Sequence, residues 1–237
     1  MTNPVLLALD LDSAAAAAAM ADRVRRHVGG FKIGSHLFTA EGPALAAALA
    51  SAGDRVFLDL KYHDIPNTVA SAIRAAARLG VWMVNVHASG GSAMMRAARD
   101  AARQAAEETG VSPLVIAVTV LTSLDEGALA DVGVSAPLLA HVERLALLAE
   151  DAGLDGVVAS PLETPRLRER CGSGFLIVTP GIRTDATPGD DQVRTLGPAA
   201  AMAAGASYLV VGRPILKAAD PVAAARAIAA SLNGERQ

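Results

Sequence analysis

The stretch Val56-Phe-Leu-Asp-Leu-Lys-Tyr-His-Asp-Ile-Pro-Asn-Thr68 begins as an apolar strand and ends beside a proline that can open a helix. Asp59 and Lys61 are two residues apart, so a regular strand places both side chains on one face of the sheet. Charges on a buried strand face have to be paired, and their pKa values are easily displaced. The stretch therefore predicts a strand, a helix, and a charged cluster at their junction that includes Asp64.

The same strand-then-helix pattern recurs along the chain. Runs rich in Val, Ile and Leu predict strands near 5–10, 30–35, 55–61, 83–88, 114–120, 156–160, 176–180 and 208–212. Amphipathic segments, many of them Ala-rich, predict helices near 13–28, 40–52, 67–79, 91–109, 137–151, 163–170, 196–204 and 219–232. Such alternation favours a closed α/β TIM barrel, (β/α)8, over a doubly wound open sheet. Because no linker divides the 237 residues, we expect one domain over 1–237.

The composition argues against several classes of protein. A hydrophobic fraction of 52% with 19% charged residues predicts a compact protein with a large core. The formal charge of −3 and the 3% of aromatic residues argue against a nucleic-acid partner. Cys171 is the one cysteine, which fits a reducing cytoplasmic location. No segment reaches the roughly 18 to 20 apolar residues of a membrane span, so no membrane partner is expected.

Polar and charged side chains follow several of the predicted strands. In a barrel of this kind the reacting groups lie at the C-terminal mouth. Lys32 alternates with Phe31 and Ile33 as if it pointed into the barrel. Asp10 could instead cap the first helix, and His87 could be an ordinary core histidine. The charged residues that we expect at the mouth are Asp10, Lys32, Asp59, Lys61, Arg183 and Arg213.

A second motif, Val211-Gly-Arg-Pro-Ile-Leu-Lys217, follows the last predicted strand. Gly212 lets the backbone approach a ligand closely, and Arg213 offers a planar bidentate donor. Barrels often bind phosphate with the loops after strands seven and eight. Together with Arg183 and Gln192 from the long polar loop near 181–192, the motif predicts an anchor for a phosphate monoester, although Arg183 alone could be a surface charge.

The sequence lacks the motifs of several common chemistries. It has no nucleophile elbow, no His-rich ligand set for zinc, and no Gly-x-Gly-x-x-Gly fingerprint after the first strand. Proton transfer and carbanion chemistry remain. A lysine ammonium held by carboxylates, as expected for Lys61, is a suitable proton donor to a carbanion.

Several segments together resemble the orotidine 5'-phosphate decarboxylase family, and the resemblance covers nearly the whole chain. The segments are Leu9-Asp10, Phe31-Lys-Ile-Gly34, Asp59-Leu-Lys-Tyr-His-Asp-Ile-Pro-Asn-Thr68, Val86-His-Ala-Ser-Gly-Gly91, Val118-Thr-Val-Leu-Thr-Ser123, Thr179-Pro-Gly-Ile-Arg183 and Val211-Gly-Arg213. The resemblance implies decarboxylation of orotidine 5'-phosphate to uridine 5'-phosphate (UMP) and CO2, the last step of de novo pyrimidine synthesis. It implies no cofactor and no metal.

The resemblance also implies roles for individual residues. Lys61 is expected to protonate C6 of the pyrimidine, within a charged array completed by Lys32, Asp59 and Asp64. In a homodimer, Asp64 of that set is expected to reach the site of the neighbouring subunit, together with Thr68. The residues expected to contact substrate are Asp10 and Lys32 at the ribose, Thr122 at the pyrimidine, Asp59 beside the departing carboxylate, and Arg183, Gln192, Gly212 and Arg213 at the phosphate. Closure of the 181–192 loop over the phosphate is a further expectation.

Two alternatives remain open on sequence alone. A Mg-dependent lyase of the 3-keto-L-gulonate 6-phosphate decarboxylase or hexulose-phosphate synthase type shares the Asp-x-Lys-x-x-Asp core, but the continuation Ile65-Pro-Asn-Thr68 favours the nucleotide enzyme. A non-catalytic nucleotide-binding protein would need the phosphate anchor but not the buried charges.

Overall fold

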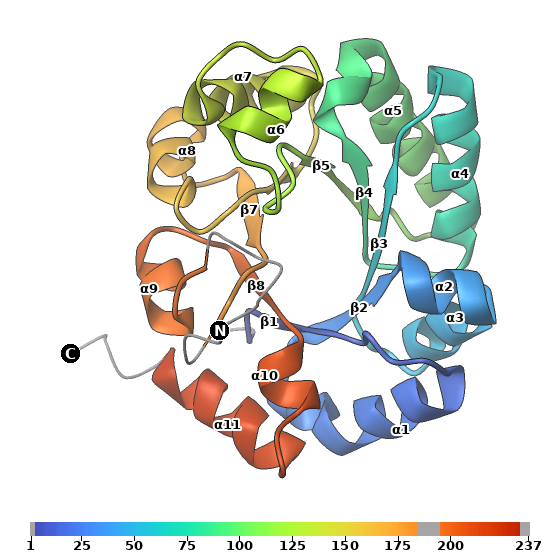
Figure 1. The fold of residues 1–237 in the computed structure, drawn as a ribbon. Helices are drawn as coiled ribbons and strands as arrows, with labels where there is room; N and C mark the ends of the chain where they lie inside the picture. The colour runs from blue at the N-terminus through green and yellow to red at the C-terminus, as the bar shows by residue number, and fades with distance from the viewer. Residues whose placement is uncertain (1–2, 184–194, 233–237) are drawn as a thin grey trace.

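The computed structural model describes residues 3–183 and 195–232, and eight parallel strands close into a barrel surrounded by helices (Figure 1). Each strand pairs with the next, and β8 returns to β1 through the partners Leu6 and Val210. The strands are β1 Val5–Ala8, β2 Gly30–Gly34, β3 Val56–Tyr62, β4 Met83–His87, β5 Leu114–Val118, β6 Gly156–Val158, β7 Leu176–Thr179 and β8 Tyr208–Val211. The predicted TIM barrel is confirmed, and the open-sheet alternative is wrong.

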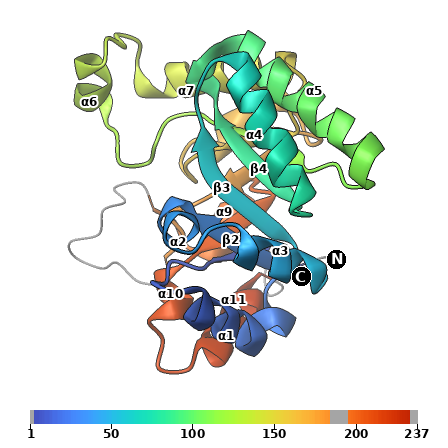
Figure 2. The ribbon, with the colours of Figure 1, turned by 90° about the vertical axis from the view of Figure 1, so that its right-hand side faces the viewer.

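The helices cover the outside of the barrel (Figures 1 and 2). They are α1 Ala14–Val24, α2 Ser35–Glu41, α3 Ala44–Ser51, α4 Pro66–Arg78, α5 Gly91–Thr109, α6 Glu126–Asp131, α7 Leu138–Asp151, α8 Thr164–Cys171, α9 Pro198–Ala203, α10 Arg213–Leu216 and α11 Pro221–Ser231. Short 3-10 turns lie at η1 Arg25–His27 and η2 Ala88–Gly90. None of the helices in these described ranges is long and apolar enough to cross a membrane.

Local sequence explains where several helices begin and end. The side chain of Ser13 accepts a hydrogen bond from the backbone N–H of Ala16, so Ser13 and not Asp10 caps α1. The helix predicted near 40–52 is preceded by a separate helix, α2. Gly42 ends α2 with a φ of 73°, and Pro43 directly precedes α3. The short helices α6 and α10 were not predicted either.

The core has two layers that meet at the barrel wall. Alternate strand residues point outward against the helices, as Val56 and Leu58 of β3 do. The residues between them fill the barrel interior, and this inner cluster consists of Leu6, Ala8, Phe57, Met83, Ile116, Val178 and Val210. The inner cluster closes the barrel from below, so side chains that follow it along the strands face the C-terminal mouth.

Candidate active site

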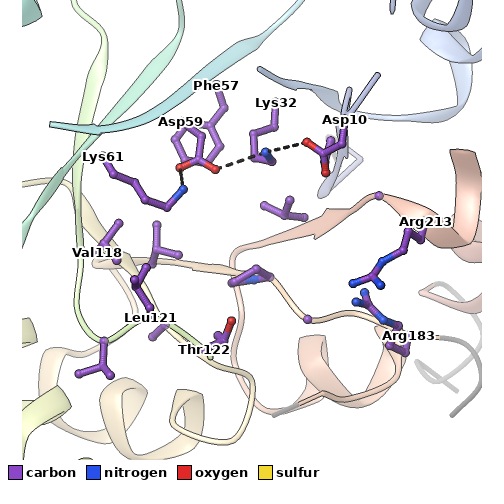
Figure 3. A pocket seen from close by; sticks show the side chains of 18 residues that line it. Asp10, Lys32, Phe57, Asp59, Lys61, Val118, Leu121, Thr122, Arg183 and Arg213 are labelled. Atoms are coloured by element: carbon purple, nitrogen blue, oxygen red, sulfur yellow. Dashed lines mark hydrogen bonds and ion pairs between the residues drawn. The ribbon is translucent and has the colours of Figure 1, made fainter. Parts of the chain in front are cut away.

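A cavity of about 270 Å³ opens at the C-terminal mouth of the barrel. Figure 3 shows charged side chains gathered at two places in it: Lys61, Asp59 and Lys32 along one wall, and Arg183 and Arg213 across the pocket from Lys61. Apolar side chains also line the cavity, among them Phe57, Val118, Val158 and Val210. Apolar walls strengthen the electrostatic interactions that a bound molecule makes with the charges.

The charged wall is a chain of ion pairs across three neighbouring strands. Lys61 Nζ lies 2.7 Å from Asp59 Oδ1, and Lys32 Nζ lies 3.3 Å from Asp59 Oδ2. Lys32 Nζ also lies 3.4 Å from Oδ1 of Asp10, which follows β1. Lys32 and Asp59 are buried, at 8% and 9% exposure, whereas Asp10 is exposed. We call Asp10, Lys32, Asp59 and Lys61 the charged array.

Asp59 is the centre of the charged array. Burial acts to raise its pKa, but the charges of Lys32 and Lys61 and hydrogen bonds from Lys61 and Asn85 together outweigh burial. The pKa of Asp59 is therefore below its usual value, and the group is a carboxylate at neutral pH. The array thus holds two ammonium groups around an ionised acid in a poorly solvated place.

Lys61 does not continue β3 as a regular strand. Its φ is 53°, the one positive value at a non-glycine residue among residues 3–183 and 195–232. The pairing of β3 with β4 shifts register between Leu58 and Tyr62, so Lys61 lies in a bulge. A left-handed backbone costs a residue with a side chain roughly 1–2 kcal/mol. The predicted strand does include Lys61, beside Asp59, since β3 continues to Tyr62, but the bulge within it was not predicted.

The arginine side of the pocket is built differently. Arg213 is exposed and begins α10 directly after β8, while Arg183 follows β7 and donates a hydrogen bond from Nη1 to the carbonyl oxygen of Ile182. Gly212 lies between β8 and α10, where a Cβ would come within 3.5 Å of the side chains of Ala8 and Asp10. We call Arg183, Gly212 and Arg213 the arginine end. Two guanidinium groups turned toward one part of a pocket favour an anion there (Figure 3).

The fold agrees with that of a solved relative of this chain. Residues 3–228 match the orotidine 5'-phosphate decarboxylase / HUMPS family. The chain belongs to this family.

Individual members are similar over nearly their full length. The orotidine 5'-phosphate decarboxylase of Moorella thermoacetica is 54% identical over 232 residues, which cover 97% of this chain and 92% of the relative. That of Alkalilimnicola ehrlichii is 55% identical over 220 residues, 93% of this chain and 92% of the relative. The crystal structure of the orotidine 5'-phosphate decarboxylase from Lactobacillus acidophilus superposes with a TM-score of 0.87 at 39% identity, covering 98% of this chain and 99% of that one.

Most of the residues singled out in the sequence come together at the pocket. Those that line it are Asp10, Lys32, Asp59, Lys61, Thr122, Arg183, Gly212 and Arg213. Asp64 and Thr68 do not line it. Both are exposed, and the Asp64 carboxylate accepts a hydrogen bond from the backbone N–H of Ile65. Gln192 and most of the 181–192 loop lie outside the described residues.

Two other candidates have different surroundings. His87 is half-buried beside the array without lining the pocket, and its ring lies 5.5 Å from that of His63. Burial and the charges of His63 and Lys61 lower the pKa of His87. The hydroxyl of Thr119, a strand-end residue that also stood out, donates a hydrogen bond to the carbonyl oxygen of Val158 and so ties β5 to β6.

Sequence reasoning missed Asn85. This side chain is fully buried, and it contacts both Asp59 and the backbone of Lys61. The available signal was an amide between Val84 and Val86 in an otherwise apolar strand, two residues after Met83 of the inner cluster. That spacing points Asn85 into the barrel, above the apolar residues that close it.

Proposed function

We propose that this chain is a carbon–carbon lyase that decarboxylates orotidine 5'-phosphate to UMP and CO2 in pyrimidine biosynthesis. The observation that carries the proposal is one pocket with a paired ammonium–carboxylate array on one wall and two guanidinium groups across from it. The array provides a proton donor beside a carboxylate, and the arginine end provides an anchor for a phosphate. Relatives that are 54% and 55% identical carry the name of this enzyme.

Lys61 is the proton donor in this proposal. The bond between C6 of the pyrimidine and its carboxylate breaks, CO2 leaves, and the electron pair stays on C6. Lys61 Nζ then gives a proton to C6, and the resulting amine regains a proton from water. The support is that Lys61 Nζ lies in the pocket and is held 2.7 Å from Asp59, so the ammonium is oriented before substrate arrives.

Asp59 and Lys32 act through charge. The carboxylate of Asp59, ionised at neutral pH, would lie beside the substrate carboxylate and repel it until CO2 has left. Lys32 lies between Asp59 and Asp10, so its ammonium is held from two sides. Both ammonium groups would stabilise the negative charge that develops on C6. This array needs no metal or cofactor for the proton transfer.

The remaining pocket residues hold the substrate. Arg183, Gly212 and Arg213 bind the phosphate, Asp10 and Lys32 contact the ribose, and Thr122 recognises the pyrimidine. Their positions around one cavity support these roles. Gln192 belongs to the phosphate contacts by resemblance alone. Binding of the phosphate, remote from C6, supplies energy that can be used to place the ring against the array.

The protein acts as a homodimer in this proposal, and Asp64 and Thr68 enter the site of the partner. Both residues are exposed and lie outside the pocket of their own chain, as expected for residues that act across an interface. Ile65 between them is 67% exposed, an apolar surface that a partner would cover.

We also propose one domain over 1–237, supported by the closed barrel and by the packing of α11 on α1. A cytoplasmic location, with no nucleic-acid or membrane partner, is supported by the lone cysteine and the charge of −3.

The test is direct. Purified protein, treated exhaustively with EDTA, is mixed with orotidine 5'-phosphate, and loss of the ultraviolet absorbance of the substrate is followed. We expect turnover to persist in EDTA and UMP to appear in equal amount to the substrate consumed. Turnover that disappears with chelation and returns with Mg²⁺ would favour the metal-dependent lyases of the same family. Saturable UMP binding without any turnover would favour a nucleotide-binding protein.

A further inference from the structure

Asn85 has two contacts, and together they determine how its amide is oriented. One atom of the amide lies 2.8 Å from the backbone N–H of Lys61, which can only donate, so this atom is the oxygen. The other atom is then the nitrogen, and it donates to Asp59 Oδ1 at 2.7 Å. A flipped amide would place its NH2 group against the N–H of Lys61 and its oxygen against the carboxylate of Asp59, and neither pair can form a hydrogen bond.

The first contact supports the bulge at Lys61. In a regular parallel ladder the N–H of each strand residue alternates between neighbouring strands. The register shift between Leu58 and Tyr62 interrupts the ladder, and the N–H of Lys61 is taken by the side chain of Asn85. Asn85 is thus the partner that lets Lys61 adopt its left-handed φ of 53° without leaving a buried donor unpaired.

The second contact orients the acid that holds the ammonium of Lys61. Asp59 Oδ1 accepts from both Lys61 Nζ and Asn85 Nδ2, each at 2.7 Å, while Oδ2 faces Lys32. Rotation of the carboxylate would break at least one of these contacts. Asn85 therefore contacts the backbone N–H of Lys61 directly, and it is linked to Lys61 Nζ through the carboxylate of Asp59.

We propose that Asn85 is a positioning residue for the decarboxylation, one that holds the bulge and the carboxylate in register so that Lys61 Nζ lies where C6 is protonated. The inference rests on the proposed function. Asn85 does not line the pocket, so its effect passes through Asp59 and Lys61. Asn85 is fully buried on β4, a strand of the barrel wall, so its side chain is held in a fixed place.

The first experiment compares Asn85→Ala with Asn3→Ala. Asn3 also donates one hydrogen bond and accepts one, at the opposite end of the barrel, since it donates to the carbonyl oxygen of His27 and accepts from the N–H of Val5. Because a displacement of about 1 Å at a reacting group can lower the rate about 100-fold, we expect kcat of Asn85→Ala to fall about 100-fold. We expect KM to change by less than about threefold, since binding at the arginine end is retained. Asn3→Ala should keep the kcat of the parent.

The pH dependence of kcat provides a readout that loss of folding alone would not change. Asp59 faces Lys32 from β2, Lys61 on its own strand, and Asn85 and His87 from β4. The hydrogen bond from Asn85 helps to lower the pKa of Asp59, so its removal raises that pKa. The acid limb of the kcat profile should therefore move to higher pH in Asn85→Ala and stay in place in Asn3→Ala.

Asn85→Asp is the second variant, because it keeps the size of the side chain and the oxygen for Lys61 but presents no N–H to Asp59 while ionised. We expect a loss of kcat at neutral pH and an acid limb at higher pH than in the parent. Folded Asn85→Ala or Asn85→Asp with kcat within about threefold of the parent would overturn the inference. Failure of both variants to fold would overturn it too, because Asn85 would then serve the stability of the barrel. Absence of turnover by the parent would instead overturn the proposed function.

Discussion

The charged array and the arginine end lie in one pocket but are built in opposite ways. Lys61 and Lys32, on β3 and β2, each pair with Asp59, at 2.7 and 3.3 Å. Arg183 and Arg213 instead follow strand ends, and Arg213 is exposed. A group held in a buried ion pair is already oriented when substrate arrives, whereas an exposed guanidinium can still turn toward a bound anion. The comparison predicts that damage to the array lowers kcat and that damage to the arginine end weakens binding.

The largest effect is expected for Lys61→Ala. Removal of the proton donor should lower kcat by about 10⁴-fold or more, the upper end of what general acid catalysis contributes. In the proposed function the array carries the chemistry and the arginine end binds the phosphate, so UMP should still bind. The measurement is single-turnover decarboxylation together with UMP titration.

Lys217→Ala is the matched control, since Lys217 is exposed beyond α10 and lies outside the pocket lining. Its kcat should equal that of the parent. Near-parental turnover by folded Lys61→Ala would end the assignment of chemistry to the array.

Asp59→Asn tests whether the array is held by its own charges. Two lysines lose a partner, so the free energy of unfolding should fall by about 3 kcal/mol at pH 7, the lower end for a broken buried pair because Lys61 is partly exposed. The pKa of Asp59 lies below 3.8, so its carboxylate stabilises the native state above pH 3.8. That contribution is lost as the pH falls further. Urea unfolding at pH 7 and pH 3 should show a difference between parent and variant that shrinks at pH 3, and an equal difference at both would contradict the account.

Arg213→Ala should act on binding. Loss of a charge-assisted pair with phosphate, worth about 1.5–3 kcal/mol, should weaken UMP binding about 10- to 100-fold. The value of kcat at saturation should fall much less. Calorimetric titration with UMP measures the change, and Arg226→Ala on α11, an exposed arginine outside the pocket, is the control. If the two variants bound UMP equally well, the arginine end would not be the phosphate anchor.

The smallest effect comes from mixing two inactive variants, Lys61→Ala and Asp64→Ala. If Asp64 acts in the partner's site, a hybrid dimer has one intact site out of two. Random exchange in an equal mixture makes about half of the dimers hybrid, so about a quarter of the parental activity should return. If hybrid dimers form but no decarboxylation activity returns, Asp64 acts in the site of its own chain or in no site.

Much of the fold followed from local sequence, because apolar runs and amphipathic segments alternate regularly. All strands begin within one residue of the predicted start. The helices α2, α6 and α10 were missed, since segments of seven, six and four residues carry too little periodic pattern. The pairing of Asp59 with Lys61 was predictable from their spacing. The gathering of Arg183, Gly212 and Arg213 at the mouth was predictable from the turn after the last strand and from the two arginines. The expectation that the substrate carries a pyrimidine ring came from the family resemblance alone.

Asn85 and the bulge at Lys61 could not be predicted in the same way. A positive φ at a lysine contradicts local preference, so only a contact from another strand can support it. That contact comes from Asn85, which is 24 residues away in the sequence. Reasoning from one segment at a time treats Asn85 as an irregularity in β4 and Lys61 as an ordinary strand residue.

The left-handed backbone at Lys61 also sets backbone preference against the ion pair with Asp59 at a single position. By backbone preference alone, glycine is the residue that suits a φ of 53°. Lys61→Gly would relieve a backbone cost of roughly 1–2 kcal/mol but would remove the ammonium that lies 2.7 Å from the buried Asp59 carboxylate. The proposed role as proton donor requires a lysine at this position, although the backbone alone favours glycine.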